Sequence, residues 1–148
     1  MSNISIATLG VSDLKRSTAF YEALGWRNSP MTQETVTFLQ GHSIVLGLFP
    51  REELAKDADI VDTPAGFRGV ALAFNQPSEN AVNTFFEKAV AAGAHPQKRP
   101  EKVFWGGYSG YFADPDGHLW EVAHNPFATM DEGGQIDLFA APSSGDAA

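Results

Sequence analysis

The chain has 148 residues, of which 43% are hydrophobic and 19% charged, and this balance excludes a disordered chain while leaving room for one domain or two half-domains around one core. It contains no cysteine, which excludes disulfides, thiolate zinc sites and a cysteine nucleophile. Its net charge of −8 should repel nucleic acid, and because neither a long apolar run nor a secretory signal is visible, we expect a cytoplasmic protein with no nucleic-acid or membrane partner.

The first half of the chain alternates between strand-like and helix-like patterns. Residues 4–11 are small and β-branched, which predicts a strand. Ser12-Asp13 then offers a helix cap before the apolar stripe of residues 14–23, and Gly25 ends that predicted helix. The other elements expected in this half are strands at 35–39 and 43–49, a short helix within 51–59 and a linker at 62–66.

The second half repeats this order. Residues 69–74 predict a strand, Pro77-Ser78 opens a helix that runs to about residue 92, and Gly93 ends it. After the helix we expect a loop rich in Pro and Lys at 95–102 and strands at 108–113 and 119–124, separated by the turn Asp114-Pro115-Asp116-Gly117.

A local echo supports a repeat. Phe20-Tyr21-Glu22 of the first helix matches Phe85-Phe86-Glu87 of the second, and each helix ends at a glycine. The repeat predicts two half-domains of similar shape in an α+β arrangement, with helices on one side of a mostly antiparallel sheet. We expect a first module, a second module and a mobile C-terminal tail at residues 1–62, 63–130 and 131–148.

Two segments carry a family resemblance. The stretch from Val11 to Tyr21, Val-Ser-Asp-Leu-Lys-Arg-Ser-Thr-Ala-Phe-Tyr, resembles the opening of the vicinal-oxygen-chelate proteins. The stretch from Tyr111 to Glu121, Tyr-Phe-Ala-Asp-Pro-Asp-Gly-His-Leu-Trp-Glu, resembles their closing signature. That superfamily groups glyoxalase I, bleomycin-resistance proteins and extradiol dioxygenases. The resemblance implies two βαβββ modules whose strands curve around a cleft, and a homodimer that completes it.

The resemblance also implies where a metal would bind. Metal-dependent members hold a divalent ion with ligands, often His and Glu, from the first and last strands of each module. Here the positions near Ile6, within 43–49 and near Gly69 offer no Asp, Glu or His, and only Glu121 matches. Because a divalent ion needs several donors, the sequence predicts no metal site and no cofactor, with a divalent metal as the alternative.

The candidate functional residues lie mainly in the second module. Glu121 stands in an otherwise apolar strand, where a carboxylate is costly unless it is paired or faces a wet cleft. We therefore predict Glu121 and Tyr111 as catalytic candidates, with Glu121 as a ligand anchor or general base. The predicted ligand-binding residues are Phe38, Trp105, Tyr108 and Glu121. The alternative for Trp105 is an interface between modules or chains.

Three functional hypotheses follow from these residues together with what the resemblance implies. The first is a metal-free protein that binds a small aromatic or apolar molecule, for sequestration or resistance. The second is a divalent-metal lyase, isomerase or extradiol dioxygenase. The third is a metal-free enzyme that uses Glu121 as a general base. The first is favoured because the metal positions lack ligands and no complete catalytic constellation is visible.

Overall fold

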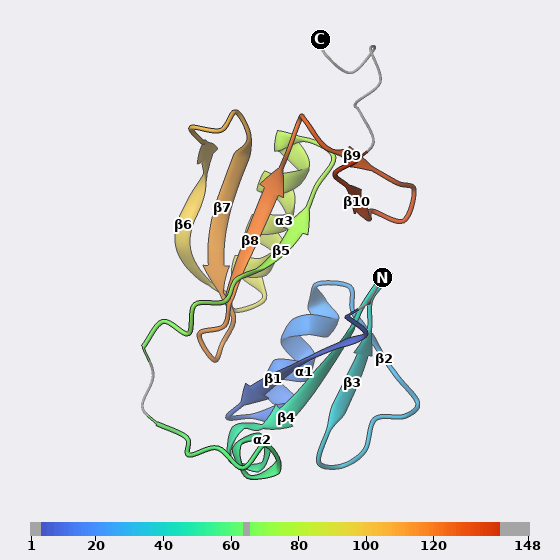
Figure 1. The fold of residues 1–148 in the computed structure, drawn as a ribbon, viewed down its shortest axis with the longest axis vertical. Coiled ribbons are helices and arrows are strands. Elements are labelled where there is room, and N and C mark those ends of the chain that lie inside the picture. The colour runs from blue at the N-terminus through green and yellow to red at the C-terminus, as the bar shows by residue number, and fades with distance from the viewer. Residues whose placement is uncertain (1–3, 64–65, 140–148) are drawn as a thin grey trace. The chain divides into compact units, whose positions relative to one another are not determined.

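The computed structural model describes residues 4–63 and 66–139, which fall into two compact units (Figure 1). Unit 1 comprises residues 1–70 together with 114–118, and unit 2 comprises residues 71–113 and 119–148. Each unit contains one four-stranded sheet in which a single neighbouring pair of strands is parallel and the others are antiparallel. The predicted α+β fold of two βαβββ modules is thereby confirmed.

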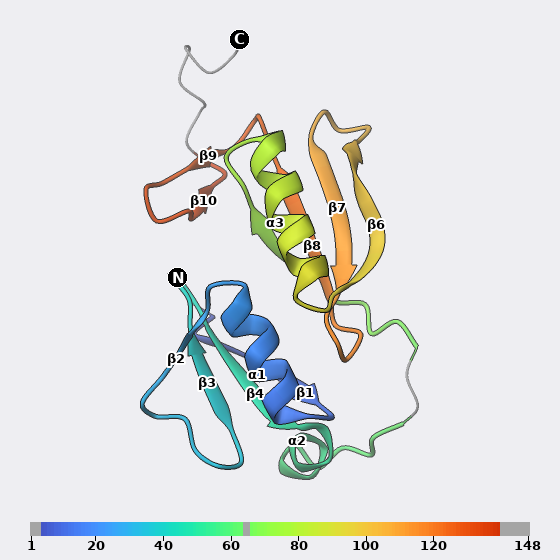
Figure 2. The same cartoon turned by 180° about the vertical axis from the view of Figure 1, so that it is seen from behind.

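The sheet of unit 1 has the strand order β1-β4-β3-β2 and carries helix α1 on one face (Figure 2). The strands are β1 (Ile6–Val11), β2 (Arg27–Asn28), β3 (Thr37–Gln40) and β4 (Val45–Pro50), and the helices are α1 (Leu14–Ala23) and α2 (Arg51–Asp57).

Helix α1 begins and ends where the sequence predicts. The Asp13 side chain accepts a hydrogen bond from the backbone N–H of Arg16, and Gly25 adopts a φ of 102°, which suits glycine after a helix. The helix buries Phe20 and Tyr21, and the sheet contributes buried leucines to the same core. These leucines are Leu39, Leu46 and Leu48.

The sheet of unit 2 has the order β5-β8-β7-β6, with helix α3 on one face (Figure 2). Its elements are β5 (Leu72–Asn75), α3 (Glu79–Ala91), β6 (His95–Lys102), β7 (Tyr108–Ala113) and β8 (Leu119–His124), followed by the pair β9 (Thr129–Met130) and β10 (Ile136–Asp137). Phe74 stacks on Trp120 with ring centroids 4.4 Å apart, and Phe112 lies against Phe74 and Phe86. This aromatic cluster fixes α3 on the sheet. No helix in the described residues is long and apolar enough to cross a membrane.

One element differs from the prediction. The Pro- and Lys-rich segment expected as a loop is strand β6, the outermost strand of its sheet. Its pairing with β7 is irregular between Pro96 and Lys98 and again between Lys98 and Glu101. An edge strand tolerates proline because its outward side needs no N–H donor, and bulges absorb the mismatch. The proline and lysine content of residues 95–102 predicts a loop, but a strand is possible there because β6 lies at the edge of its sheet.

Part of the predicted tail also has structure. Residues Ile136 and Asp137 of β10 pair with β9 in an antiparallel ladder. Residues 140–148 of the expected tail lie outside the described part of the chain.

Gly110 lets β6 approach β7 closely, and this leads to a stability prediction. A Cβ at this position would lie 2.7 Å from the Lys98 carbonyl oxygen and 2.7 Å from the Pro100 nitrogen, both of them backbone atoms. We expect Gly110→Ala to lower the free energy of unfolding by about 2 kcal/mol through overpacking, as measured by urea denaturation.

The matched control is Gly47→Ala in unit 1, where the added Cβ would lie 3.1 Å from the Thr8 hydroxyl oxygen and 3.6 Å from the nearest Ile6 carbon, both of them side-chain atoms. Equal losses in the two variants would contradict the steric explanation.

Candidate functional site

The two faces of the sheet in unit 2 carry different chemistry. Phe112 and Trp120 face α3 and form the core, since both join the aromatic cluster. Tyr111 and Glu121 pair directly across β7 and β8 and, by the alternation of strand side chains, lie on the opposite face. The structure thus brings together the two residues predicted as catalytic candidates.

The Tyr111–Glu121 pair is partly buried and hydrogen-bonded. Burial raises the pKa of Tyr111, and the charge of Glu121 together with its hydrogen bond to the tyrosine raises it further. The phenol therefore stays protonated at neutral pH and donates to the carboxylate. Ala73 of β5 pairs with Glu121 on its other side, so a small side chain flanks the carboxylate. The arrangement can accept a hydrogen bond from a ligand or take a proton from one.

Unit 1 repeats this register with different residues. Gly47 of β4 pairs with Phe38 of β3 and with Thr8 of β1, just as Glu121 of β8 pairs with Tyr111 of β7 and Ala73 of β5. Gly47 and Glu121 are each the third residue of their strand. Phe38, predicted to bind ligand, thus occupies in unit 1 the place that Tyr111 occupies in unit 2, and its role stays a prediction.

The same register shows which residue types stand at the strand positions where the resemblance implies metal ligands. The first and last strands of the two modules present Thr8, Gly47, Ala73 and Glu121 at matching positions. At these positions unit 1 offers a hydroxyl and no carboxylate or imidazole, and unit 2 offers one carboxylate, so neither unit supplies by itself the several donors that a divalent ion requires. No group of three or more His, Cys, Asp or Glu side chains in residues 4–63 and 66–139 is arranged to hold a metal ion. The residues present do not fit the metal that the resemblance implies.

A pocket of about 430 Å³ lies in unit 2, where the β6–β7 hairpin, the end of β8 and the first turn of α3 meet. Its lining residues are Glu79, Lys102, Val103, Gly106, Gly107, Tyr108, His124 and Pro126. Tyr108 and His124 pair across β7 and β8, and the Tyr108 hydroxyl donates to Asn83 Oδ1 on α3 at 2.7 Å. Tyr108 therefore lies on the α3 side of the sheet, on the face opposite Glu121.

The aromatic hairpin beside this pocket depends on two glycines. Gly106 has a φ of 95° and donates its N–H to the Val103 carbonyl, which closes the turn. A Cβ at Gly107 would overlap the ring of Trp105, and one at Gly106 would come within 2.8 Å of the Phe127 ring. The two rings lie on the glycine backbone, and Trp105 remains 37% exposed.

The predicted site residues thus separate into groups. Tyr111 and Glu121 share one face, whereas Tyr108 belongs to the pocket on the other and Trp105 covers Gly107 beside it. Sequence reasoning missed His124 and Lys102 as pocket residues. The tight turn between β7 and β8 fixes which residues of the two strands pair. Counting outward from that turn would have placed His124 opposite Tyr108.

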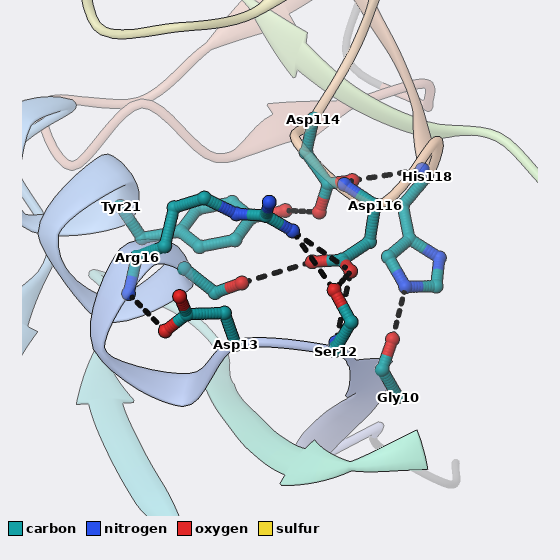
Figure 3. Close-up of polar contacts among 9 residues, drawn as sticks. Gly10, Ser12, Asp13, Arg16, Tyr21, Asp114, Asp116 and His118 are labelled. Carbon is teal, nitrogen blue, oxygen red and sulfur yellow. Dashed lines mark hydrogen bonds and ion pairs between the residues drawn. The ribbon is translucent and has the colours of Figure 1, made fainter.

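The Asp114-Pro115-Asp116-Gly117 turn serves the structure of unit 1 (Figure 3). Asp116 accepts hydrogen bonds from the Ser12 backbone N–H at 2.9 Å, the Ser12 hydroxyl at 2.8 Å and the Ser17 hydroxyl at 2.9 Å, and it pairs with Arg16. Burial alone would raise the pKa of Asp116, but these donors outweigh it and leave that pKa below its ordinary value. The carboxylate holds the N-terminal end of α1.

The other polar groups of this turn are also engaged within unit 1. The buried Tyr21 hydroxyl donates to Asp114 Oδ2 at 2.6 Å, and the backbone N–H groups of Asp116 and His118 donate to Asp114 Oδ1. His118 Nε2 donates to the Gly10 carbonyl at 2.7 Å, as Figure 3 shows. These hydrogen bonds join the turn to β1 and α1, so we assign it a role in the stability of unit 1.

Comparisons with known proteins agree with this fold. The model of the Glyoxalase/Bleomycin resistance protein/Dioxygenase superfamily matches residues 3–122. A glyoxalase-related enzyme from Fulvimarina pelagi is 34% identical, with a TM-score of 0.81 over 95% of this chain and 100% of its own.

Two further structures share the fold. A glyoxalase/bleomycin resistance protein/dioxygenase family enzyme from Burkholderia phytofirmans is 22% identical, with a TM-score of 0.74 over 83% of this chain and 98% of its own. A lactoylglutathione lyase from Agrobacterium tumefaciens is 22% identical, with a TM-score of 0.64 over 84% of this chain and 95% of its own. No curated protein matches the chain. By the family model and the 34% identical relative, the chain belongs to the Glyoxalase/Bleomycin resistance protein/Dioxygenase superfamily.

Proposed function

We propose that this protein binds a small aromatic or apolar molecule without a metal ion, in the manner of sequestration or resistance proteins of its superfamily. The observation that carries the proposal is the identity of the residues at the matching strand positions. Thr8, Gly47 and Ala73 provide no carboxylate or imidazole, which leaves Glu121 as the only strong donor among the four. These residue types support a metal-free site, because a divalent ion needs several strong donors.

Glu121 and Tyr111 are the proposed anchor for the ligand. A partly buried carboxylate that already accepts a phenol hydrogen bond has lone pairs left for an N–H or O–H group of a ligand. Ala73 beside it leaves room for an apolar body next to the polar contact. This combination suits a molecule with one hydrogen-bond donor and a larger apolar part.

Two enzymatic alternatives remain as proposals. A proton-transfer enzyme is favoured by the same pair, because Glu121 beside a protonated Tyr111 could act as a general base with the phenol holding a developing negative charge. A metal-dependent lyase, isomerase or dioxygenase is favoured only by the resemblance to relatives such as the lactoylglutathione lyase. Its test is metal content and thermal shift with Ni, Zn, Mn and Fe. A stoichiometric, stabilising ion would overturn the metal-free proposal.

The binding proposal predicts the effect of removing the carboxylate charge. With bleomycin and catechol as probes in a Trp fluorescence titration, Glu121→Gln should weaken binding roughly tenfold or more, since a hydrogen bond to a charged group is worth about 1.5–3 kcal/mol. The matched control is Glu101→Gln on β6 of the same sheet, whose carboxylate forms an exposed ion pair with Lys98. Binding left intact by Glu121→Gln, or weakened equally by both changes, would exclude Glu121 as the anchor.

Assembly and location complete the proposal. We propose a homodimer, as the family resemblance implies, and a cytoplasmic location, in keeping with a chain that has no cysteine.

A further inference from the structure

We propose that the pocket beneath the β6–β7 hairpin is a second ligand site in unit 2, built for a small aromatic carboxylate that carries a hydroxyl group. It is separate from the Tyr111–Glu121 pair, because Tyr108 of the pocket lies on the face of the sheet that carries α3. The site therefore goes beyond the proposed function, and either can fail without the other.

The size and floor of the pocket suit a single flat ring. Its volume of about 430 Å³ falls in the range of roughly 300–1,000 Å³ that is usual for small-molecule sites. Gly106 and Gly107 line it and contribute only backbone atoms, which take up little of its volume. Trp105 and Phe127 pack on these two glycines and hold the hairpin in shape.

Two polar groups in the wall are fixed in position. The Tyr108 hydroxyl donates to Asn83 Oδ1 and keeps its oxygen available as an acceptor. His124 Nδ1 donates to the Gln76 carbonyl at 3.0 Å, so Nδ1 carries a proton. The other nitrogen, Nε2, then has a lone pair to accept a hydrogen bond. The Tyr108 oxygen and His124 Nε2 can each accept a hydrogen bond from a hydroxyl group of the ligand.

The charge at the mouth selects an anion. Lys102 Nζ lies 3.9 Å from Glu79 Oε1, and the two side chains are 85% and 44% exposed. An ion pair this long and this exposed contributes little to stability. A ligand carboxylate can therefore replace Glu79 as the partner of Lys102. Glu79 is the first residue of α3, and the N-terminal end of a helix favours negative charge.

The test uses 4-hydroxybenzoate, benzoate and 4-hydroxybenzyl alcohol as probes of the full chain. We expect calorimetry to give one saturable 4-hydroxybenzoate site per chain, with benzoate and the neutral alcohol each at least about fivefold weaker. In NMR spectra, 4-hydroxybenzoate should shift the backbone amides of Val103, Gly107 and His124 and leave that of Glu121 in place.

Variants locate the contacts. Lys102→Gln should raise the Kd for 4-hydroxybenzoate about tenfold, the loss of one charged hydrogen bond, whereas Lys98→Gln on the same strand should leave it unchanged. Glu121→Gln should also leave it unchanged, which separates this site from the proposed function. Absence of saturable binding, equal affinity for the alcohol, equal effects of the two lysine changes, or amide shifts centred on Glu121 would each overturn the proposal.

Discussion

Replacing Asp114 by alanine is expected to lower the free energy of unfolding by about 4 kcal/mol, because several hydrogen bonds meet at one buried carboxylate. Asp114 is 3% exposed and accepts the hydroxyl of Tyr21, itself fully buried, together with two backbone N–H groups of the turn. Alanine would remove the carboxylate to which the Tyr21 hydroxyl and the two N–H groups donate. Urea denaturation followed by circular dichroism measures the loss.

Two further variants test this reasoning about Asp114. Asp131 also accepts a backbone N–H, from Gln135 at 2.8 Å, but it is exposed, so Asp131→Ala should cost less than about 1 kcal/mol. Tyr21→Phe removes the hydroxyl and leaves Asp114 with its backbone donors, for an expected loss of about 1–2 kcal/mol. A loss for Asp114→Ala no greater than that of Asp131→Ala would refute the role assigned to burial.

Replacing Asp116 by alanine should cost about 3 kcal/mol at pH 7, since its side chain is 9% exposed and accepts three hydrogen bonds at the start of α1. The folded pKa of Asp116 lies below its ordinary value, so its ionisation stabilises the fold above the unfolded pKa of about 4 and ceases to do so as the pH falls through the lower, folded pKa. The difference in the free energy of unfolding between wild type and Asp116→Ala should therefore be constant from neutral pH down to about 5 and shrink below about 4.

Denaturation curves from pH 7 to pH 3 measure this dependence. The control is Asp62→Ala, which removes an ion pair with Arg51 on the surface. Hydrogen bonding and the charge of Arg51 lower the pKa of Asp62 too, but the exposed pair should contribute clearly less at every pH. A loss for Asp116→Ala that did not change with pH would mean that the carboxylate charge is not what stabilises α1.

Periodicity and turn chemistry were enough to predict most of the fold. Helix α1 lies at the predicted residues 14–23, because the Asp13 cap and Gly25 define its ends locally. Strands β7 and β8 also lie where predicted, on either side of a tight turn. Strand β6 was missed since its tolerance for Pro96 and Pro100 depends on its edge position, which the local sequence does not reveal.

The candidate site was predicted less completely, for a physical reason. Strand alternation places Tyr111 and Glu121 together only once the register of β7 and β8 is known, and the same register places Tyr108 on the other face. The pocket residues come from α3, β6 and β8, which are distant in sequence. Lys102 and Glu79 carry no pattern that marks them as neighbours, so only the folded chain brings them into one cavity.

The turn at residues 114–118 has a consequence for dividing the polypeptide. Although β7 and β8 precede and follow it, these five residues belong to unit 1, where Asp116 binds Ser12 and Asp114 binds Tyr21. A fragment that stopped at residue 70 would lack the Asp116 carboxylate at the start of α1 and the Asp114 carboxylate to which the Tyr21 hydroxyl donates. Split genes and chimeras with relatives must therefore keep this pentapeptide matched to the N-terminal half it completes, rather than to the strands that carry it.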